Sequence, residues 1–184
     1  VLLSIGGWGS GRFSEMAAND EYRRAFAVDC ERVVEEFALD GIDIDWEYPT
    51  SSMANISSSP DDTENFTLLM QDIRAAIGNE KELTLATVAS ARYIDFKAIL
   101  PSVDFVNIMA YDMASAPKHH SALYPSGHSG DITSDGAVTA HLKAGVPPSK
   151  LVMGMPFYGR GGDGYPSFQD SVSYTHLTLP TNSR

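Results

Sequence analysis

The feature that most constrains the fold is an alternation of short apolar runs with segments of helical periodicity. Five runs have the length and composition of buried strands, at 1–5, 41–46, 83–89, 103–110 and 151–157. Between them, apolar residues recur at helical spacing in four segments, near 26–37, 66–77, 94–100 and 137–144. Such strand–helix–strand units predict a parallel sheet of the α/β class, either an open doubly wound sheet or a barrel. Periodicity alone leaves both architectures open.

The charge balance of the chain narrows the classes of partner. Asp and Glu outnumber Lys and Arg by 24 to 13, which gives a formal net charge of −11. A nucleic-acid binder needs a basic face to displace counterions, and no cluster of Lys and Arg occurs in this sequence. An anionic membrane surface would repel the chain, and no apolar run approaches the roughly 18 residues of a membrane span. We therefore expect no nucleic-acid partner and no membrane partner, and a neutral or cationic ligand.

A row of acids occupies the run 40–47, which reads DGIDIDWE. Successive side chains of a strand point to opposite faces, so Asp43, Asp45 and Glu47 share one face and lie about 6.6 Å apart along the strand. Repulsion between the carboxylates, together with loss of hydration inside a sheet, keeps at least one of them protonated. A carboxyl group that holds its proton near neutral pH is what a general acid requires.

Two other interpretations of the acidic row are a solvated strand and a metal site. Alternating acids usually mark the solvated face of an edge strand, but strands of a parallel α/β series are buried on both faces, where idle carboxylates are costly. Paired acids can also hold Mg²⁺ or Ca²⁺, but one strand presents a row rather than a cage. The adjacent His119 and His120 have no evident third ligand and are interpreted as an exposed loop pair. We expect no metal and no cofactor.

Four motifs together resemble glycoside hydrolase family 18. The run 40–47 matches the family's DxxDxDxE signature, and residues 1–8 (VLLSIGGW) resemble its preceding SxGG strand. Residues 109–112 (MAYD) and 155–160 (MPFYGR) resemble two later strand ends of the family, in the same order. The resemblance extends from residue 1 to about residue 168. It implies a chitinase on a (β/α)₈ TIM barrel, of which about strands three to seven are present.

The resemblance also implies a mechanism, which is substrate-assisted, retaining hydrolysis of β-1,4-linked N-acetylglucosamine polymers such as chitin and chito-oligosaccharides. In this mechanism Glu47 protonates the glycosidic oxygen and then acts as the base for water. Asp45 binds the acetamido N–H, and Asp43 shares a proton with Asp45. Tyr111 donates its hydroxyl to the acetamido oxygen, and Asp112 supports the same sugar.

A second set of residues is expected to contact the substrate or shape its pocket, because sugar rings have apolar faces that stack on aromatic side chains. These residues lie at the predicted strand ends: Trp8, Tyr48, Met109, Tyr158, Arg160 and Gly7. Glycines at positions 6 and 7 are expected to let the backbone pass close to neighbouring strands or to sugar.

Two alternative functions stay open at the level of sequence. The first is a related family 18 enzyme, an endo-β-N-acetylglucosaminidase or a peptidoglycan hydrolase. The second, of another class, is a chitinase-like lectin that binds without cutting. Such lectins usually lack the last acid of the signature, so the presence of Glu47 favours an enzyme.

The ends of the chain depart from a complete barrel, which has roughly 250 residues. Strands one, two and eight, and the family's strand-eight Trp, have no counterpart. We expect residues 1–170 to be a partial family 18 catalytic barrel that folds poorly and has little or no activity alone, because sheet edges and apolar faces are bare. Residues 171–184 are interpreted as a cloning-derived tail. The complete enzyme is expected to be a secreted monomer.

Overall fold

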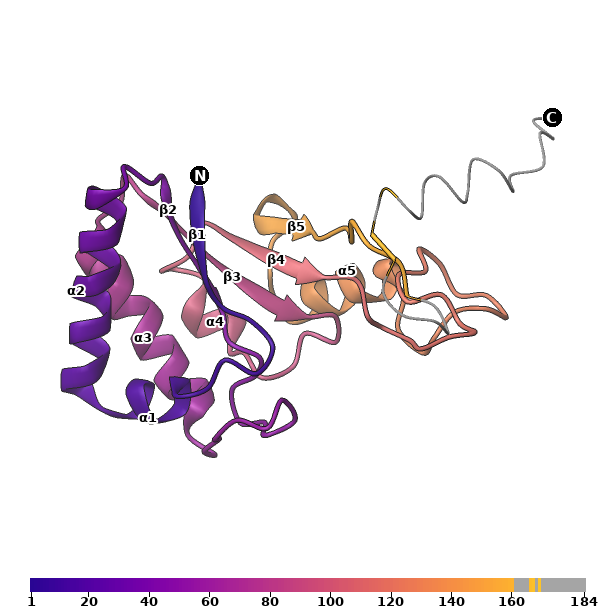
Figure 1. The fold of residues 1–184 in the computed structure, drawn as a ribbon, viewed down its shortest axis with the longest axis horizontal. Coiled ribbons are helices and arrows are strands. Elements are labelled where there is room, and N and C mark those ends of the chain that lie inside the picture. The colour runs from indigo at the N-terminus through magenta and orange to yellow at the C-terminus, as the bar shows by residue number, and fades with distance from the viewer. Residues whose placement is uncertain (161–165, 168, 170–184) are drawn as a thin grey trace.

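The computed structural model describes residues 1–160, 166–167 and 169, and a five-stranded parallel sheet forms its centre. Each strand pairs with the next one in the chain (Figure 1). The strands are β1 (Leu2–Gly6), β2 (Gly41–Asp45), β3 (Glu82–Val88), β4 (Phe105–Met109) and β5 (Leu151–Met153). The α/β class is thereby confirmed. This sequential parallel order is the order of strands in part of a (β/α)₈ barrel.

Helices connect the strands, and all but the first lie where the periodicity indicates. They are α1 (Phe13–Ala18), α2 (Asp20–Glu36), α3 (Asp62–Ile77), α4 (Phe96–Ile99) and α5 (Ser134–Lys143), followed by a 3₁₀ turn at Pro148–Lys150. Helix α2 begins where the Asn19 side chain accepts a hydrogen bond from the backbone of Tyr22 at 3.0 Å. Helix α3 ends at Gly78, whose φ of 74° suits glycine. Figure 1 shows α1, α2 and α3 packed together on one side of the sheet.

The main apolar core lies between the sheet and these helices. Ile42 and Ile44 of β2 are completely buried on the helix side of the strand. Trp46 continues the same face, where it stacks on Phe13 with ring centres 5.4 Å apart and meets the edge of Phe66 at 5.5 Å. Because β2 alternates, this packing turns the acidic row to the opposite face of the strand.

Two elements differ from the sequence-based expectation. Helix α1 was not predicted, because six residues are too few for a periodic signal, and it is held by the burial of Phe13 against Trp46. Strand β5 ends at Met153 rather than at residue 157. The Gly154 N–H still donates to the Ile108 carbonyl at 2.8 Å, but Pro156 has no N–H to extend the ladder.

One buried carboxylate, that of Asp62, fixes the segment between β2 and α3. Asp61 occupies the capping position of α3 but makes no capping bond with its side chain. Asp62 is fully buried, and its Oδ1 accepts a hydrogen bond from Ser14 Oγ at 2.7 Å. Its Oδ2 accepts from the backbone N–H of Thr50 at 3.0 Å and of Ser59 at 2.8 Å. A single side chain thus ties α1 to both ends of the loop that follows β2.

Residues 171–184, interpreted from the sequence as a tail, lie outside the described residues, and the boundary at residue 170 stays a prediction. Among the helices of the described part, none is both long and apolar enough to cross a membrane.

Candidate active site

A cleft of about 780 Å³ opens at the carboxyl ends of the strands. Its size falls within the roughly 300–1,000 Å³ of small-molecule sites. The residues that line it are Trp8, Asp45, Glu47, Tyr48, Met53, Val88, Ala89, Ser90, Arg92, Met109, Tyr111, Asp112, Met113, Ile132 and Arg160. Residues at or beyond the ends of all five strands therefore meet at one site, which is where parallel α/β folds bind their ligands.

Asp43, the inner member of the acidic row, is a hydrogen-bond acceptor for side chains of three other strands. Its Oδ2 accepts from Ser4 Oγ of β1 at 2.7 Å, and its Oδ1 accepts from Thr84 Oγ1 of β3 at 2.6 Å. Nδ2 of Asn107 on β4 donates to the same Oδ1 at 3.1 Å. The side chain is 9% exposed. Asp43 therefore holds the sheet together below the cleft, and the proton shared with Asp45 stays a prediction.

Asp45, the next member of the row, has opposite surroundings. Its Oδ1 is buried and has no hydrogen-bond partner within the described ranges. Burial, followed by the charges of Glu47 and Asp43, raises the pKa of Asp45 to about 7. The backbone is fixed at this point, because the Gly7 N–H donates to the Asp45 carbonyl at 2.8 Å and a Cβ at Gly6 would lie 2.0 Å from that oxygen. This carboxyl group is therefore firmly placed and has one oxygen without a donor.

Glu47 lies beyond the end of β2 and lines the cleft. Burial raises its pKa, a hydrogen bond with Tyr48 lowers it and the charge of Asp112 raises it, and the result lies above the ordinary value. The Tyr48 ring stacks on Tyr93 at 5.4 Å and meets Trp8 edge-on at 6.4 Å. These three rings, which we term the aromatic wall, stand next to a carboxyl group suited to proton donation.

Tyr111 follows β4 and lines the same cleft. Burial, followed by the charges of Asp45 and Glu47, raises the pKa of Tyr111, so its hydroxyl keeps its proton. Its ring meets Tyr158 edge-on at 6.1 Å. A protonated phenol in this position can donate a hydrogen bond to a ligand in the cleft.

Asp112 belongs to an ion-pair cluster on the cleft wall. Nε and Nη2 of Arg160 donate to its two carboxylate oxygens, and the guanidinium lies 5.8 Å from the centre of the Tyr158 ring. Burial acts to raise the pKa of Asp112, but hydrogen bonds from Arg160 and Tyr158 outweigh it and lower that pKa. Burial, with the hydrogen bond to Asp112, raises the pKa of Tyr158 to about 12. Asp112 is therefore a fixed anion, and its direct contact with sugar stays a prediction.

Comparison with known proteins identifies the family. Residues 1–178 match the model of glycosyl hydrolases family 18. The chain belongs to this family. Chitinase A1 of Niallia circulans is 38% identical, over 89% of this family 18 chain and 27% of its own length. Chitotriosidase-1 of Mus musculus is 36% identical, over 87% of this chain and 38% of its own length. The chain thus spans well under half of these curated relatives.

Solved structures give the same family 18 assignment. The chitinase domain of the spore coat protein CotE from Clostridium difficile superposes with a TM-score of 0.89 at 37% identity, over 99% of this chain and 55% of that one. A family 18 N-acetylglucosaminidase from Paenibacillus barengoltzii gives 0.85 at 37% identity, over 94% of this chain and 60% of that one. The predicted family and fold class are confirmed.

Most of the family 18 site residues predicted from the sequence meet in the cleft. Those that line it are Trp8, Asp45, Glu47, Tyr48, Met109, Tyr111, Asp112 and Arg160. Asp43 instead lies below the cleft, where it is bonded to Ser4, Thr84 and Asn107. Tyr158 packs against the lining residue Tyr111. Gly7 acts through its backbone, with a φ of 100° that favours glycine and a bond to Asp45. Whether each of these residues contacts sugar stays a prediction.

His120 corrects the expectation of an exposed histidine pair. Its side chain is 12% exposed, its Nδ1 accepts from the Asp112 N–H at 3.3 Å, and its ring lies 5.4 Å from that of Tyr158. The reason is that the loop folds back on itself and brings His120 next to Asp112, since the Met113 N–H donates to the His120 carbonyl at 2.9 Å. His119 remains exposed. Across the described residues, no three His, Cys, Asp or Glu side chains are grouped so as to hold a metal.

The sequence analysis did not predict that the turn after β3 contributes to the cleft. Ser90 and Arg92 line the cleft, and Tyr93 completes the aromatic wall. The signal was available, because these residues directly follow the predicted strand 83–89 and active sites of barrels gather at such strand ends. Met53, Met113 and Ile132 come from loops whose paths the sequence does not reveal.

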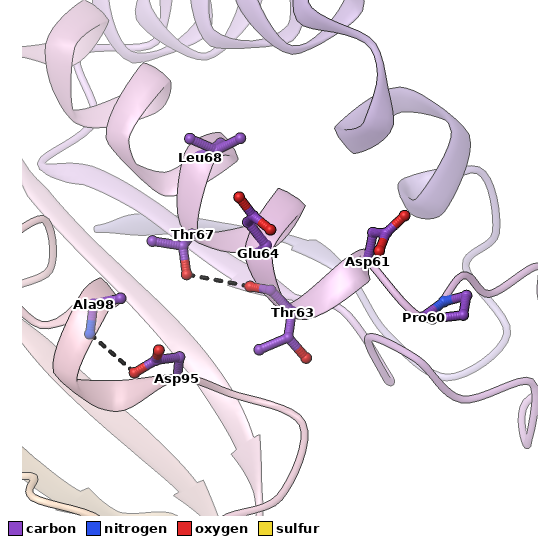
Figure 2. Close-up of a pocket in the computed structure, with 8 residues that line it drawn as sticks. All are labelled: Pro60, Asp61, Thr63, Glu64, Thr67, Leu68, Asp95 and Ala98. Carbon is purple, nitrogen blue, oxygen red and sulfur yellow. Dashed lines mark hydrogen bonds between the residues drawn. The ribbon is translucent and has the colours of Figure 1, made fainter.

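A second hollow of about 480 Å³ lies outside the sheet, between the start of α3 and α4 (Figure 2). Its lining is Pro60, Asp61, Thr63, Glu64, Thr67, Leu68, Asp95 and Ala98. Local bonds occupy polar groups here, since Thr67 Oγ1 donates to the Thr63 carbonyl at 3.2 Å and the Ala98 N–H donates to Asp95 Oδ1 at 3.1 Å. None of the predicted site residues lines it, so the candidate active site is the larger cleft.

Proposed function

We propose that this family 18 chain forms the catalytic part of a glycosidase that hydrolyses β-1,4-linked N-acetylglucosamine polymers, such as chitin and chito-oligosaccharides. The observation that carries the proposal is the buried Oδ1 of Asp45, which has no donor within the described residues, next to Glu47 in the cleft. A buried polar atom usually has a partner. The N–H of an acetamido group would supply it, and the chitinases among the relatives support this choice of substrate.

In the proposed mechanism the acetamido oxygen of the substrate is the nucleophile, so no second carboxylate is needed for that role. Glu47 gives its proton to the glycosidic oxygen, and the bond between this oxygen and C1 breaks. The acetamido oxygen forms a bond to C1, which gives an oxazolinium ion. Water then attacks C1 and passes a proton to Glu47, and the acetamido group is restored. The product keeps the configuration of the substrate.

The remaining residues prepare the acetamido group for this attack. Asp45 accepts its N–H and stabilises the positive charge that develops on the oxazolinium ring. Tyr111, which keeps its proton, donates to the acetamido oxygen. Asp43 adds a charge that raises the pKa of Asp45, and in the proposed mechanism it shares a proton with it. Fixed groups of this kind stabilise the transition state because they need little reorganisation.

The related family 18 activities differ from this proposal in the substrate, which is an N-glycan core or peptidoglycan. Within the proposed activity, the release of single sugars is supported by the similar structure of an N-acetylglucosaminidase from Paenibacillus barengoltzii. A polymeric substrate of this size is degraded outside the cell, so we further propose a secreted enzyme, acting as a monomer. Analysis of products from chitohexaose separates chain cleavage in the interior from release at an end.

The decisive experiment compares the longest gene product that contains this sequence with its Glu47→Gln variant. Fluorophore release from a chitobiose glycoside is measured for both proteins. We expect release to fall by roughly 10²- to 10⁴-fold in the variant, which has the same shape but no proton to give. Glu21→Gln, on the exposed surface of α2, is the matched control and should leave release unchanged.

Each other outcome contradicts a part of the proposal. Equal release by the parent protein and Glu47→Gln means that Glu47 is not the acid. Binding of chito-oligosaccharides without release by either protein favours the lectin. If neither binding nor release occurs, N-glycan cores and peptidoglycan are the next substrates to assay.

A further inference from the structure

The turn after β3 holds an arginine in the cleft by an unusual backbone. Ala91 has a φ of 57° and Tyr93 a φ of 74°, in the left-handed region that residues other than glycine seldom adopt. The turn is closed by a bond from the Ala91 N–H to the Val88 carbonyl at 2.9 Å. Thr63 Oγ1 of α3 donates to the Tyr93 carbonyl at 3.1 Å and fixes its far side. Strain of this kind persists where the surroundings enforce it, often at functional sites.

Arg92, between these two residues, is held from two sides. Its Nε donates to Ser90 Oγ at 3.1 Å, and its guanidinium lies 6.0 Å from the centre of the Tyr93 ring. Tyr93 in turn stacks on Tyr48 of the aromatic wall. For the part of the chain that the structure describes, neither terminal nitrogen of Arg92 has an acceptor. These donors therefore remain available at the sugar-stacking side of the cleft.

The charges that line the cleft determine how Arg92 affects a charged ligand. The other charged residues that line the cleft are Asp45, Glu47, Asp112 and Arg160. Arg160 is already bound to Asp112, so among the described residues that line the cleft Arg92 is the cation without an ion-pair partner. The charge of Arg92 therefore repels a protonated amine in the cleft, because unit charges act over about 10 Å at moderate salt.

We propose that Arg92 is a specificity-determining residue, which makes the cleft select N-acetylated sugar units over units with a free amine at the position beside Tyr48 and Tyr93. This inference rests on the proposed function and adds the substrate class that the site prefers. The terminal nitrogens donate to hydroxyl and carbonyl oxygens of a neutral acetylated unit. The same nitrogens repel the ammonium group of a deacetylated unit, as found in chitosan.

The test measures binding in the Glu47→Gln background of the longest gene product that contains this sequence, so that turnover does not interfere. Calorimetry at mildly acidic pH gives the Kd of fully acetylated and of partly deacetylated oligosaccharides of equal length. At about 0.01 M salt, we expect Arg92→Gln to lower the preference for the acetylated sugar by about three- to tenfold. At about 1 M salt the difference should shrink, because the screening length falls to roughly 3 Å.

Two further variants separate charge from shape. Arg92→Lys keeps the charge and should keep most of the preference, although it loses the planar fork and the stacking on Tyr93. Arg32→Gln, on the exposed face of α2, is the matched control and should change nothing. An unchanged preference in Arg92→Gln, or a change that is equally large at high salt, overturns the inference and leaves the proposed function standing. If the acetylated sugar does not bind at all, the proposed function fails as well.

Discussion

Asp62 and Asp45 are two acids near the same end of the sheet, and their hydrogen bonding is opposite. Asp62 accepts from Ser14 and from two backbone N–H groups, so both its oxygens are engaged. Asp45 has a buried oxygen without a donor in the described part of the chain, and its pKa rises to about 7. Burial alone does not separate a structural acid from a functional one. The hydrogen-bond donors around the acid separate the two cases, because an acid that the fold leaves without donors can accept a hydrogen bond from a ligand.

The largest expected effect is the loss of stability in Asp62→Ala. The substitution leaves one hydroxyl and two backbone N–H groups without their acceptor, so the free energy of unfolding should fall by about 3–5 kcal/mol. Chemical denaturation of the longest gene product that contains this sequence gives this value. Asp61→Ala is the matched control, since Asp61 is exposed and makes no capping bond, and it should stay within about 0.5 kcal/mol. Equal losses of stability in both variants would show that the hydrogen bonds of Asp62 do not stabilise the fold, and Asp62 would then no longer contrast with Asp45.

Asp43→Ala tests an acid that lies in the same row as Asp45 but, like Asp62, accepts hydrogen bonds on both oxygens. Its loss leaves donors on Ser4, Thr84 and Asn107 unpaired, so we expect destabilisation of about 2–3 kcal/mol. Thr84→Val removes one of those donors while the acid remains. The double variant should be less destabilised than the sum of the single ones, by about 0.5–1.5 kcal/mol. Strict additivity would show that this hydrogen bond does not couple the two strands.

Asp45→Asn should give the smallest change and the opposite sign. The pKa of this acid rises from 3.8 to about 7 on folding, so the folded state holds the proton more tightly between these two values. The stability of the parent protein therefore falls as pH rises from about 4 to about 7, and the variant lacks this loss. At pH 8 we expect Asp45→Asn to be more stable by about 1–2 kcal/mol, less than the full shift implies because solvent still reaches part of the group.

Denaturation midpoints at pH 4 and pH 8 measure this difference. At pH 4 the two proteins should be similar, because Asp45 then carries its proton and resembles the amide. A variant that is less stable at both values would mean that Asp45 is as well satisfied as Asp62, which breaks the comparison.

Local patterns were sufficient for the sheet and for the acidic row. The alternation in 40–47 places Ile42 and Ile44 on the face opposite the acids, and both are fully buried. The parallel pairing of the strands followed from the series of strand–helix units, as the structure confirms. Both predictions depend on neighbours in the sequence, which is why a single chain could supply them.

The features that the sequence did not reveal depend on contacts between distant segments. Asp62 lies shortly before the predicted helical segment 66–77, but its partner Ser14 lies 48 positions away, and no local signal marks such a bond. His120 is withdrawn from solvent because the chain returns to Asp112 and reaches Tyr158, contacts that a loop sequence does not encode visibly. Arg92 belongs to an intermediate case, since its place at a strand end was predictable and its stacking on Tyr93 was not.

The hydrogen bonds of Asp62 also determine which part of the chain near the cleft can change in length. One oxygen binds the N–H groups of both Thr50 and Ser59, so the loop between them is closed at its base by a single atom. Closing a longer loop is inexpensive, at about 0.6 kcal/mol for each doubling of length. Met53 lies on this loop and lines the cleft. The exposed part of the loop around Met53 can therefore lengthen at small cost if Ala54 and Ile56 keep their places in the core, and the candidate site beneath Tyr48 then stays where it is.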